Sequence, residues 1–140
     1  MALWLMKSEP DVYSFDDLIE QGEGTWDGVR NHSAAIHLKA MAVGDQALFY
    51  HSNIGKEAVG IMTISAPALP DPTEPEGTRW VAVKVKPLAR LVEPVTLAAI
   101  KAEPRLAEME MLRLNRLSVA PVRESEWAVL MEMAGGMKPL

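Results

Sequence analysis

Residues 26–31 read Trp26-Asp27-Gly28-Val29-Arg30-Asn31, and the interpretation of the whole chain starts from this stretch. It places an indole, a carboxylate, a guanidinium and an amide between two segments with helical patterns. Two similar clusters each follow a short apolar run: Lys7-Ser8-Glu9-Pro10 and Tyr50-His51-Ser52-Asn53. Binding residues often lie where the chain leaves a rigid scaffold. We therefore expect the three clusters to line one cavity at one mouth of the fold.

Length and composition indicate an ordinary globular domain. The chain has 140 residues, 49% of them hydrophobic and 24% charged, which suits one domain with a substantial core. No apolar run is long enough to span a bilayer, and the N-terminus lacks the basic region of a signal peptide. There are no cysteines, which excludes disulfides and thiolate metal sites. We expect a cytoplasmic monomer with no membrane segment.

The net charge of −5 is unevenly distributed along the chain. Residues 1–60 carry nine acidic and four basic side chains, whereas residues 79–123 carry nine basic and four acidic ones. An overall acidic protein is a poor general binder of polyanions, but a basic face on it could hold a few phosphates. On charge alone, solvated surface side chains are the simpler interpretation.

Hydrophobic periodicity predicts short strands separated by helices. We expect strands at 2–7, 47–50, 58–65, 80–86 and 117–122, the second and third forming a hairpin. Ser14 caps a helix with Asp17 in a capping-box position, and Asn31 caps a second one whose inner stripe is Ala34, Leu38 and Met41. Further helices are expected at 97–102, 107–112 and 124–134, and a long proline-rich loop at 66–78. In 80–86 the valines should point inward, and Trp80, Ala82 and the lysines outward.

This pattern predicts one α+β domain, a small and partly open barrel with helices around it. Trp4 and Trp127 lie on apolar stripes and are expected in the core. Trp26 lies outside any such stripe. It either stacks on a planar ligand or plugs the mouth of the barrel, and the sequence leaves both interpretations open.

Catalytic equipment is sparse. His51 and Ser52 beside Asp27 or Glu9 could form a hydrolytic triad, but there is no nucleophile elbow. The three histidines lack zinc-ligand spacing, and no glycine-rich phosphate loop opens a helix. We therefore expect no catalytic residue, no metal and no cofactor.

The remaining polar residues suit a recognition site. Lys7 supplies a cation, Ser8 and Asn53 supply donors and acceptors, and Glu9 or Asp27 can accept a hydrogen bond from an exocyclic amine or an imino N–H. Groups of this kind read the edge of a base that has left its stack.

The chain resembles the EVE domain family, a member of the PUA-like superfamily that also includes the YTH and ASCH domains. The resemblance covers nearly the whole chain, and several motifs in order make it specific. The motifs are residues 4–10, Tyr13-Ser14, Asp17-Leu18, residues 26–31, Gly44-Asp45, residues 49–53, residues 59–61, Arg79-Trp80, residues 116–122 and Glu126-Trp127.

The resemblance implies a single domain over residues 1–140, a PUA-like barrel of about five to six strands flanked by helices. It also implies non-catalytic binding of DNA or RNA through a pocket for a single flipped-out base, which we expect to be modified. By analogy with YTH domains, Trp26 would be a wall of an aromatic cage, and Ser8 and Glu9 would face the base edge. The expected pocket residues are Lys7, Ser8, Glu9, Tyr13, Trp26, Asp27, Arg30, Asn31, Tyr50, His51, Ser52 and Asn53. The expected phosphate contacts are Arg79, Trp80, Lys84, Arg116 and Ser118.

One departure from the family pattern bears on function. After Asn31 the family usually has Tyr-Gln-Ala-Arg-Asn, whereas this chain has His32-Ser33-Ala34-Ala35-Ile36. Ala35 and Ile36 thus remove two polar contacts that the second helix would make. Two other functions stay open: an enzyme of the same superfamily, a nuclease or small-molecule hydrolase using His51, Lys7 and Glu9, and a protein-interaction scaffold. Turnover would identify the enzyme, and tolerance of a changed pocket would identify the scaffold.

Overall fold

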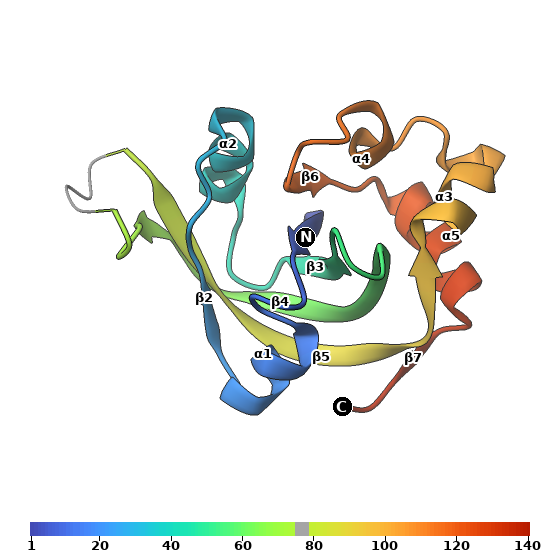
Figure 1. Ribbon diagram of the computed structural model, residues 1–140, viewed down its shortest axis with the longest axis horizontal. Coiled ribbons are helices and arrows are strands. Elements are labelled where there is room, and N and C mark those ends of the chain that lie inside the picture. The colour runs from blue at the N-terminus through green and yellow to red at the C-terminus, as the bar shows by residue number, and fades with distance from the viewer. Residues whose placement is uncertain (75–78) are drawn as a thin grey trace.

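The computed structural model describes residues 1–74 and 79–140, and a single curled sheet lies at its centre (Figure 1). The strand order is β2-β5-β4-β3-β1-β6, and β7 pairs with β5. β1 is parallel to β3, and the other neighbouring strands are antiparallel. This is the mixed, partly open barrel that the sequence predicts. The strands are β1 (Leu3–Ser8), β2 (Gly24–Trp26), β3 (Gln46–His51), β4 (Glu57–Pro70), β5 (Val81–Thr96), β6 (Val119–Pro121) and β7 (Met137–Lys138).

Five α-helices and one short 3-10 helix surround the sheet among the described residues: α1 (Phe15–Gln21), α2 (His32–Ala40), α3 (Leu97–Ala102), η1 (Pro104–Leu106), α4 (Glu110–Arg113) and α5 (Glu124–Ala134). The predicted caps are confirmed. The Ser14 hydroxyl accepts a hydrogen bond from the Asp17 N–H, the Asp17 carboxylate accepts one from the Ser14 N–H, and Asn31 Oδ1 accepts one from the Ala34 N–H. In the described part of the chain, no helix is both long and apolar enough to cross a membrane.

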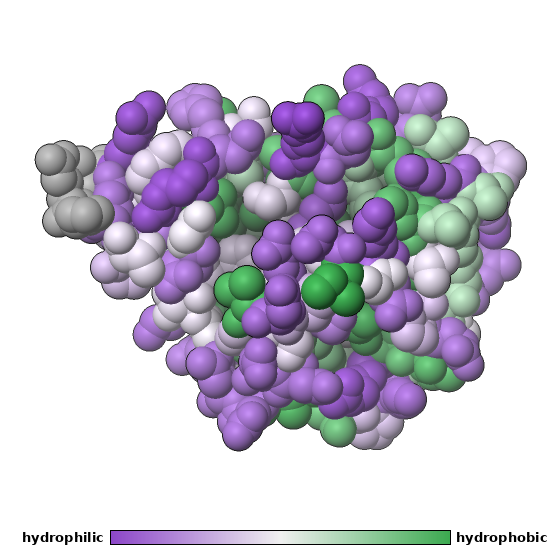
Figure 2. Space-filling model, in the orientation of Figure 1, coloured by the Kyte–Doolittle hydropathy of each residue, from purple (hydrophilic) through white to green (hydrophobic). Residues whose placement is uncertain are grey.

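Both faces of the central strands are buried. Successive side chains of a strand point to opposite faces, so each central strand contributes to two core clusters. On β1, Trp4 and Met6 join a first core cluster, which α1 and α2 complete with Phe15, Leu18 and Leu38. Leu3 and Leu5 join a second cluster, which α3, α4 and α5 complete. The visible face of the molecule is mostly hydrophilic (Figure 2).

The strands β4 and β5 are longer than the sequence indicates. Residues 66–70, predicted as part of a loop, belong to β4 and pair with β5 through register shifts. Proline is tolerated there because β4 pairs with β3 only as far as Thr63, so one side of this segment has no partner strand among the described residues. Residues 75–78 of the predicted loop lie outside the described residues. The strand predicted at 80–86 continues as β5 to Thr96.

Several side chains also differ from the prediction. Ala82 is buried rather than outward, although Lys84 and Lys86 on the same face of β5 are exposed. On α5 the buried stripe is formed by Val129, Leu130 and Ala134, while Trp127 packs against it only in part. Trp26 ends β2 opposite Val83 and belongs to the first core cluster. Its placement outside any apolar stripe was therefore wrong, because a three-residue strand is too short to show a period.

Candidate functional site

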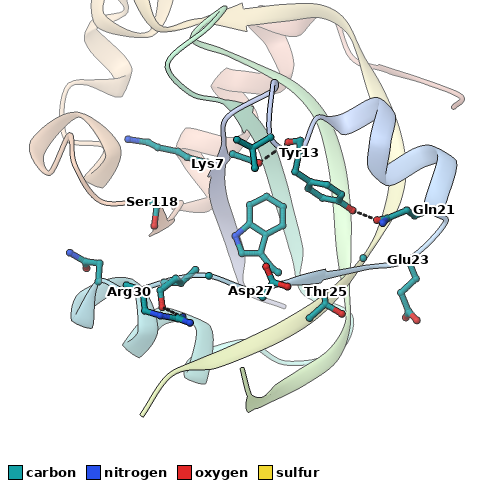
Figure 3. A pocket seen from close by; sticks show the side chains of 15 residues that line it. Lys7, Tyr13, Gln21, Glu23, Thr25, Asp27, Arg30 and Ser118 are labelled. Carbon is teal, nitrogen blue, oxygen red and sulfur yellow. Dashed lines mark hydrogen bonds between the residues drawn. The ribbon is translucent and has the colours of Figure 1, made fainter. Parts of the chain in front are cut away.

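A cavity of about 650 Å³ opens where β1, α1, β2 and the loop before α2 meet; we call it the first cavity. Lys7 and Ser118 lie on one side of it, Tyr13, Gln21 and Glu23 on the other, and Asp27 and Arg30 along its edge (Figure 3). Its lining residues are Lys7, Ser8, Val12, Tyr13, Gln21, Glu23, Gly24, Thr25, Trp26, Asp27, Gly28, Val29, Arg30, Asn31 and Ser118.

Aromatic side chains form the base of the first cavity. The Trp26 ring meets Tyr13 and Phe49 in edge-to-face contacts, with centroids 6.4 Å and 5.3 Å apart. Trp26 is only 6% exposed, so it is a core residue that also lines the cavity. Tyr13 is less buried than Trp26.

Polar groups surround these rings. The Ser8 hydroxyl donates a hydrogen bond to the Tyr13 carbonyl, at 2.7 Å, and the Tyr13 hydroxyl donates one to Gln21. Burial, followed by the negative charges of Asp17 and Asp27, raises the pKa of Tyr13. The Asp27 charge therefore acts on a residue that lines the cavity, although the Asp27 side chain is itself exposed. A carboxylate in this position can accept a hydrogen bond from a bound donor.

Asp71 fixes the loop that carries Asp27, and the sequence interpretation missed it. Its buried carboxylate accepts hydrogen bonds from the Gly28 N–H at 2.8 Å and from Arg30 Nη1 at 3.0 Å. It also accepts bonds from the N–H and hydroxyl of Thr73. Burial alone would raise the pKa of Asp71, but the bonds from Thr73, Arg30 and Gly28 outweigh it and lower this pKa to about 2. The Asp71-Pro72-Thr73 sequence could have indicated this turn, because the aspartate side chain often accepts a hydrogen bond from the N–H of the residue two positions later.

The second cavity, of about 380 Å³, lies on the other side of the end of β1. It shares only Lys7 and Ser118 with the first. The expectation that all three polar clusters line one cavity is therefore wrong: residues 26–31 face the first cavity, whereas Tyr50, Ser52 and Asn53 face the second. The second cavity is lined by Lys7, Glu9, Tyr50, Ser52, Asn53, Lys56, Leu97, Asn115, Arg116 and Ser118.

Lys7 lies at the junction of the two cavities. Its Nζ donates a hydrogen bond to the Asn115 carbonyl at 3.1 Å and stands 5.9 Å from the centre of the Tyr50 ring. Burial lowers the pKa of Lys7. Burial, assisted by the charge of Glu57, raises the pKa of Tyr50 to about 12. Lys7 is thus a half-buried cation within reach of ligands in either cavity.

His51 lines neither cavity. Its Nε2 accepts a hydrogen bond from the Phe15 N–H at 3.2 Å, and its ring meets Phe49 edge to face. Burial lowers the pKa of His51, although Glu57 and Asp16 oppose this effect. The described residues contain no group of three or more histidines and carboxylates that could hold a metal ion.

The five expected phosphate contacts divide between two regions. Arg116 and Ser118 line the second cavity. The guanidinium groups of Arg30 and Arg79 lie over the Trp80 ring, at 5.7 Å and 5.3 Å from its centroid. Lys84 is exposed on β5, where it is paired with Thr25 of β2.

Comparison with known proteins identifies relatives over almost the full length of the chain. A family model described as the EVE domain matches residues 2–133. Human thymocyte nuclear protein 1 is 31% identical over 163 aligned positions, which cover 93% of this chain and 72% of that protein.

Solved structures agree in fold. The NMR structure of Rpa0253 from Rhodopseudomonas palustris is 51% identical, with a TM-score of 0.90 and coverage of 96% of this chain and 94% of the other. The crystal structure of human THYN1 in complex with 5-methylcytosine-containing DNA is 29% identical, with a TM-score of 0.88 and coverage of 96% and 98%. An ASCH structure from Zymomonas mobilis, 12% identical with a TM-score of 0.57, shares the fold alone.

Proposed function

This chain belongs to the EVE domain family, and from that premise we propose that it binds nucleic acid without catalysing a reaction. In this proposal a single modified base, turned out of its stack, occupies the first cavity. The human relative crystallised with 5-methylcytosine-containing DNA supports nucleic acid as the partner.

The observation that carries the proposal is the make-up of the first cavity. Its volume of about 650 Å³ lies within the usual range of ligand pockets. Tyr13 and Trp26 give it aromatic walls, which suit a base because every base has a flat face that stacks on such rings. Asp27 and Ser8 add groups that can read hydrogen bonds at the base edge.

Asp27 favours one class of base. A carboxylate accepts hydrogen bonds and repels the carbonyl oxygens of a ligand. A base that presents an amino group, as cytosine and adenine do, therefore suits this edge of the cavity better than thymine or uracil does.

The competing enzyme proposal depends on His51, and the geometry does not favour it. The Nε2 atom of His51 already accepts a hydrogen bond from the Phe15 N–H, and its ring packs on Phe49. A general base needs a nitrogen within reach of the substrate. His51 instead connects the start of α1 to β3.

The test is a titration monitored by tryptophan fluorescence. The probes are DNA and RNA oligonucleotides of one sequence that carry one 5-methylcytosine, another modified base or no modification. We expect saturable one-to-one binding that is tightest for a modified oligonucleotide, with no product after long incubation. Equal affinity for all the oligonucleotides, or turnover of any of them, would refute the proposal.

A pair of variants links this binding to the first cavity. Tyr13→Leu removes an aromatic wall, whereas Trp127→Leu removes a partly buried aromatic residue that packs against the second core cluster and lines neither cavity. Stacking contributes about 1–3 kcal/mol per base, so Tyr13→Leu should weaken binding roughly 5- to 150-fold. Trp127→Leu should leave the affinity near that of the natural chain.

A further inference from the structure

A base in the first cavity stays attached to its sugar and phosphates, so the strand must leave across the rim of that cavity. The two sides of the rim differ in charge. One side carries the carboxylate of Glu23, and the edge between the two sides carries Asp27 and Arg30, whose guanidinium is paired with Asp71. The other carries Lys7 and Ser118, which also line the second cavity. An anionic backbone is repelled by the first side and attracted by the second.

Cations accumulate beyond the Lys7 side. Lys7, Lys56 and Arg116 line the second cavity, against the single carboxylate of Glu9. A third cavity, of about 350 Å³, adjoins it through Lys56 and Leu97 and contains Lys101 as well. The third cavity is lined by Gly55, Lys56, Thr96, Leu97, Ala98 and Lys101, and no carboxylate is among them.

These cations are available for a ligand. Within the described ranges, none of Lys7, Lys56, Lys101 and Arg116 lies within ion-pair distance of a carboxylate, whereas Arg30, Arg90, Arg105, Arg113 and Arg123 each do.

The backbone around the cations is also fixed. The Lys56 carbonyl accepts a hydrogen bond from the Leu97 N–H at 2.8 Å, which attaches the turn after β3 to the start of α3. The Ser52 N–H donates to the Ser8 carbonyl at 2.9 Å, which attaches the same turn to the end of β1.

We propose that the second and third cavities bind the phosphates of the strand whose base occupies the first cavity. This inference rests on the proposed function and adds the path of the backbone. Lys7 contacts the phosphate nearest the base, and Arg116, Lys56 and Lys101 neutralise its neighbours. The path excludes Arg79, Lys84 and Lys86, which line none of these three cavities.

Two triple variants with the same change in charge test this path. The first is Lys56→Gln/Lys101→Gln/Arg116→Gln, and its matched control is Lys84→Gln/Lys86→Gln/Arg79→Gln. Each removes two lysines and one arginine. The dissociation constants are measured for a DNA oligonucleotide with one 5-methylcytosine and for the unmodified oligonucleotide, between about 50 and 200 mM salt. Melting temperatures verify that both variants fold.

Each neutralised phosphate contributes about 0.7–0.9 to the slope of log K against log salt. The first variant should therefore lower the magnitude of the slope by about 2 to 3 with either oligonucleotide, and the control should leave it unchanged. The preference for the methylated oligonucleotide should persist in both variants. An unchanged slope in the first variant, or an equal loss in the control, would overturn the inference.

The same data separate this inference from the proposed function. If the natural chain binds both oligonucleotides equally, and no other modified base is preferred, the base-reading function fails, while the loss of slope still supports the phosphate path. If the natural chain binds neither oligonucleotide at about 50 mM salt, both proposals fail.

Discussion

Asp27 is an exposed carboxylate at the edge of a cavity with aromatic walls. Burial, the charge of Asp17 and then the charge of Asp27 together raise the pKa of Tyr13. In the proposed complex Asp27 accepts a hydrogen bond from an amino group of the base. Asparagine keeps an acceptor oxygen but loses the charge. Hydrogen bonds to charged groups contribute about 1.5–3 kcal/mol and neutral ones about 0.5–1.5 kcal/mol, so Asp27→Asn should weaken binding of the preferred oligonucleotide by about five- to tenfold.

The control for this substitution is Asp11→Asn, which changes the charge equally at an exposed position that does not line the first cavity. Removing a negative charge should by itself favour a polyanion, so Asp11→Asn should bind as well as the natural chain or better. Titration of both variants separates the two effects. Equal affinities for the two variants would show that Asp27 does not contact the base.

His51 predicts a pH dependence of stability. Its pKa in the folded state lies below the ordinary 6.5, first because of burial. Below about pH 6.5, His51 therefore binds a proton more readily in the unfolded chain than in the folded chain. The free energy of unfolding should fall as the pH decreases from 6.5 towards the lower pKa of the folded state, and it should be unaffected by this group at higher pH.

The measurement is urea unfolding over a range of pH, for the natural chain and for His51→Gln. Glutamine keeps an acceptor for the Phe15 N–H, so the cost at neutral pH should be about 1 kcal/mol or less. The variant should lose this part of the pH dependence, whereas His32→Gln, at an exposed position, should keep it. An identical pH profile in His51→Gln would exclude His51 as its source.

At the scale of elements, the loop from β2 to α2 depends on the connection between β4 and β5. Asp71 joins them through its bonds to Gly28 and Arg30. Asp71→Ala leaves these donors without their partner, which should cost about 3 kcal/mol of stability. It should also weaken oligonucleotide binding, because Asp27 precedes Gly28 in the same loop.

Thermal unfolding and the titration measure both effects, with Asp11→Ala as the exposed control. Since the pKa of Asp71 is about 2, the stabilisation should persist down to about pH 4 and disappear as the pH approaches 2. If Asp71→Ala melts at the same temperature as the control, the proposed role of this contact is wrong.

Local signals predicted the elements well where the interactions were local. Ser14, Asp17 and Asn31 marked the starts of α1 and α2, because a cap requires only residues within one helical turn. The burial of Trp26 and the strand at residues 66–70 could not be predicted from local signals in the same way. Both depend on pairing with β5, whose partners are far away in the sequence.

The alternation of side chains along β3 explains part of the division of the expected cavity. Tyr50 and His51 are neighbours and point to opposite faces, so Tyr50 lines the second cavity whereas His51 packs on Phe49 and lines neither. The sequence identified the polar clusters at the strand ends. It did not indicate that their members would be shared between the faces, because both faces of these strands are buried.

At the scale of the whole molecule, the curled sheet places acidic and basic groups on different sides of one opening. Asp27 and Glu23 border the first cavity, and Lys56, Lys101 and Arg116 border the cavities beyond Lys7. The excess of basic residues in 79–123 and of acidic residues in 1–60 was evident from the sequence. The turn after β3 adds Lys56 to the basic side, and only the fold reveals this.

The central claim is that a single base enters the first cavity, and the four tryptophans provide a direct test by NMR. The indole N–H signals of three of them report on separate places: Trp26 lines the first cavity, Trp4 donates to buried Asp45, and Trp127 packs against the second core cluster. The Trp26 signal is assigned from its loss in Trp26→Phe. Addition of an oligonucleotide with one modified base should shift the Trp26 signal strongly and leave those of Trp4 and Trp127 in place, while the unmodified oligonucleotide should shift it less. A saturated complex in which the Trp26 signal does not move would contradict the account.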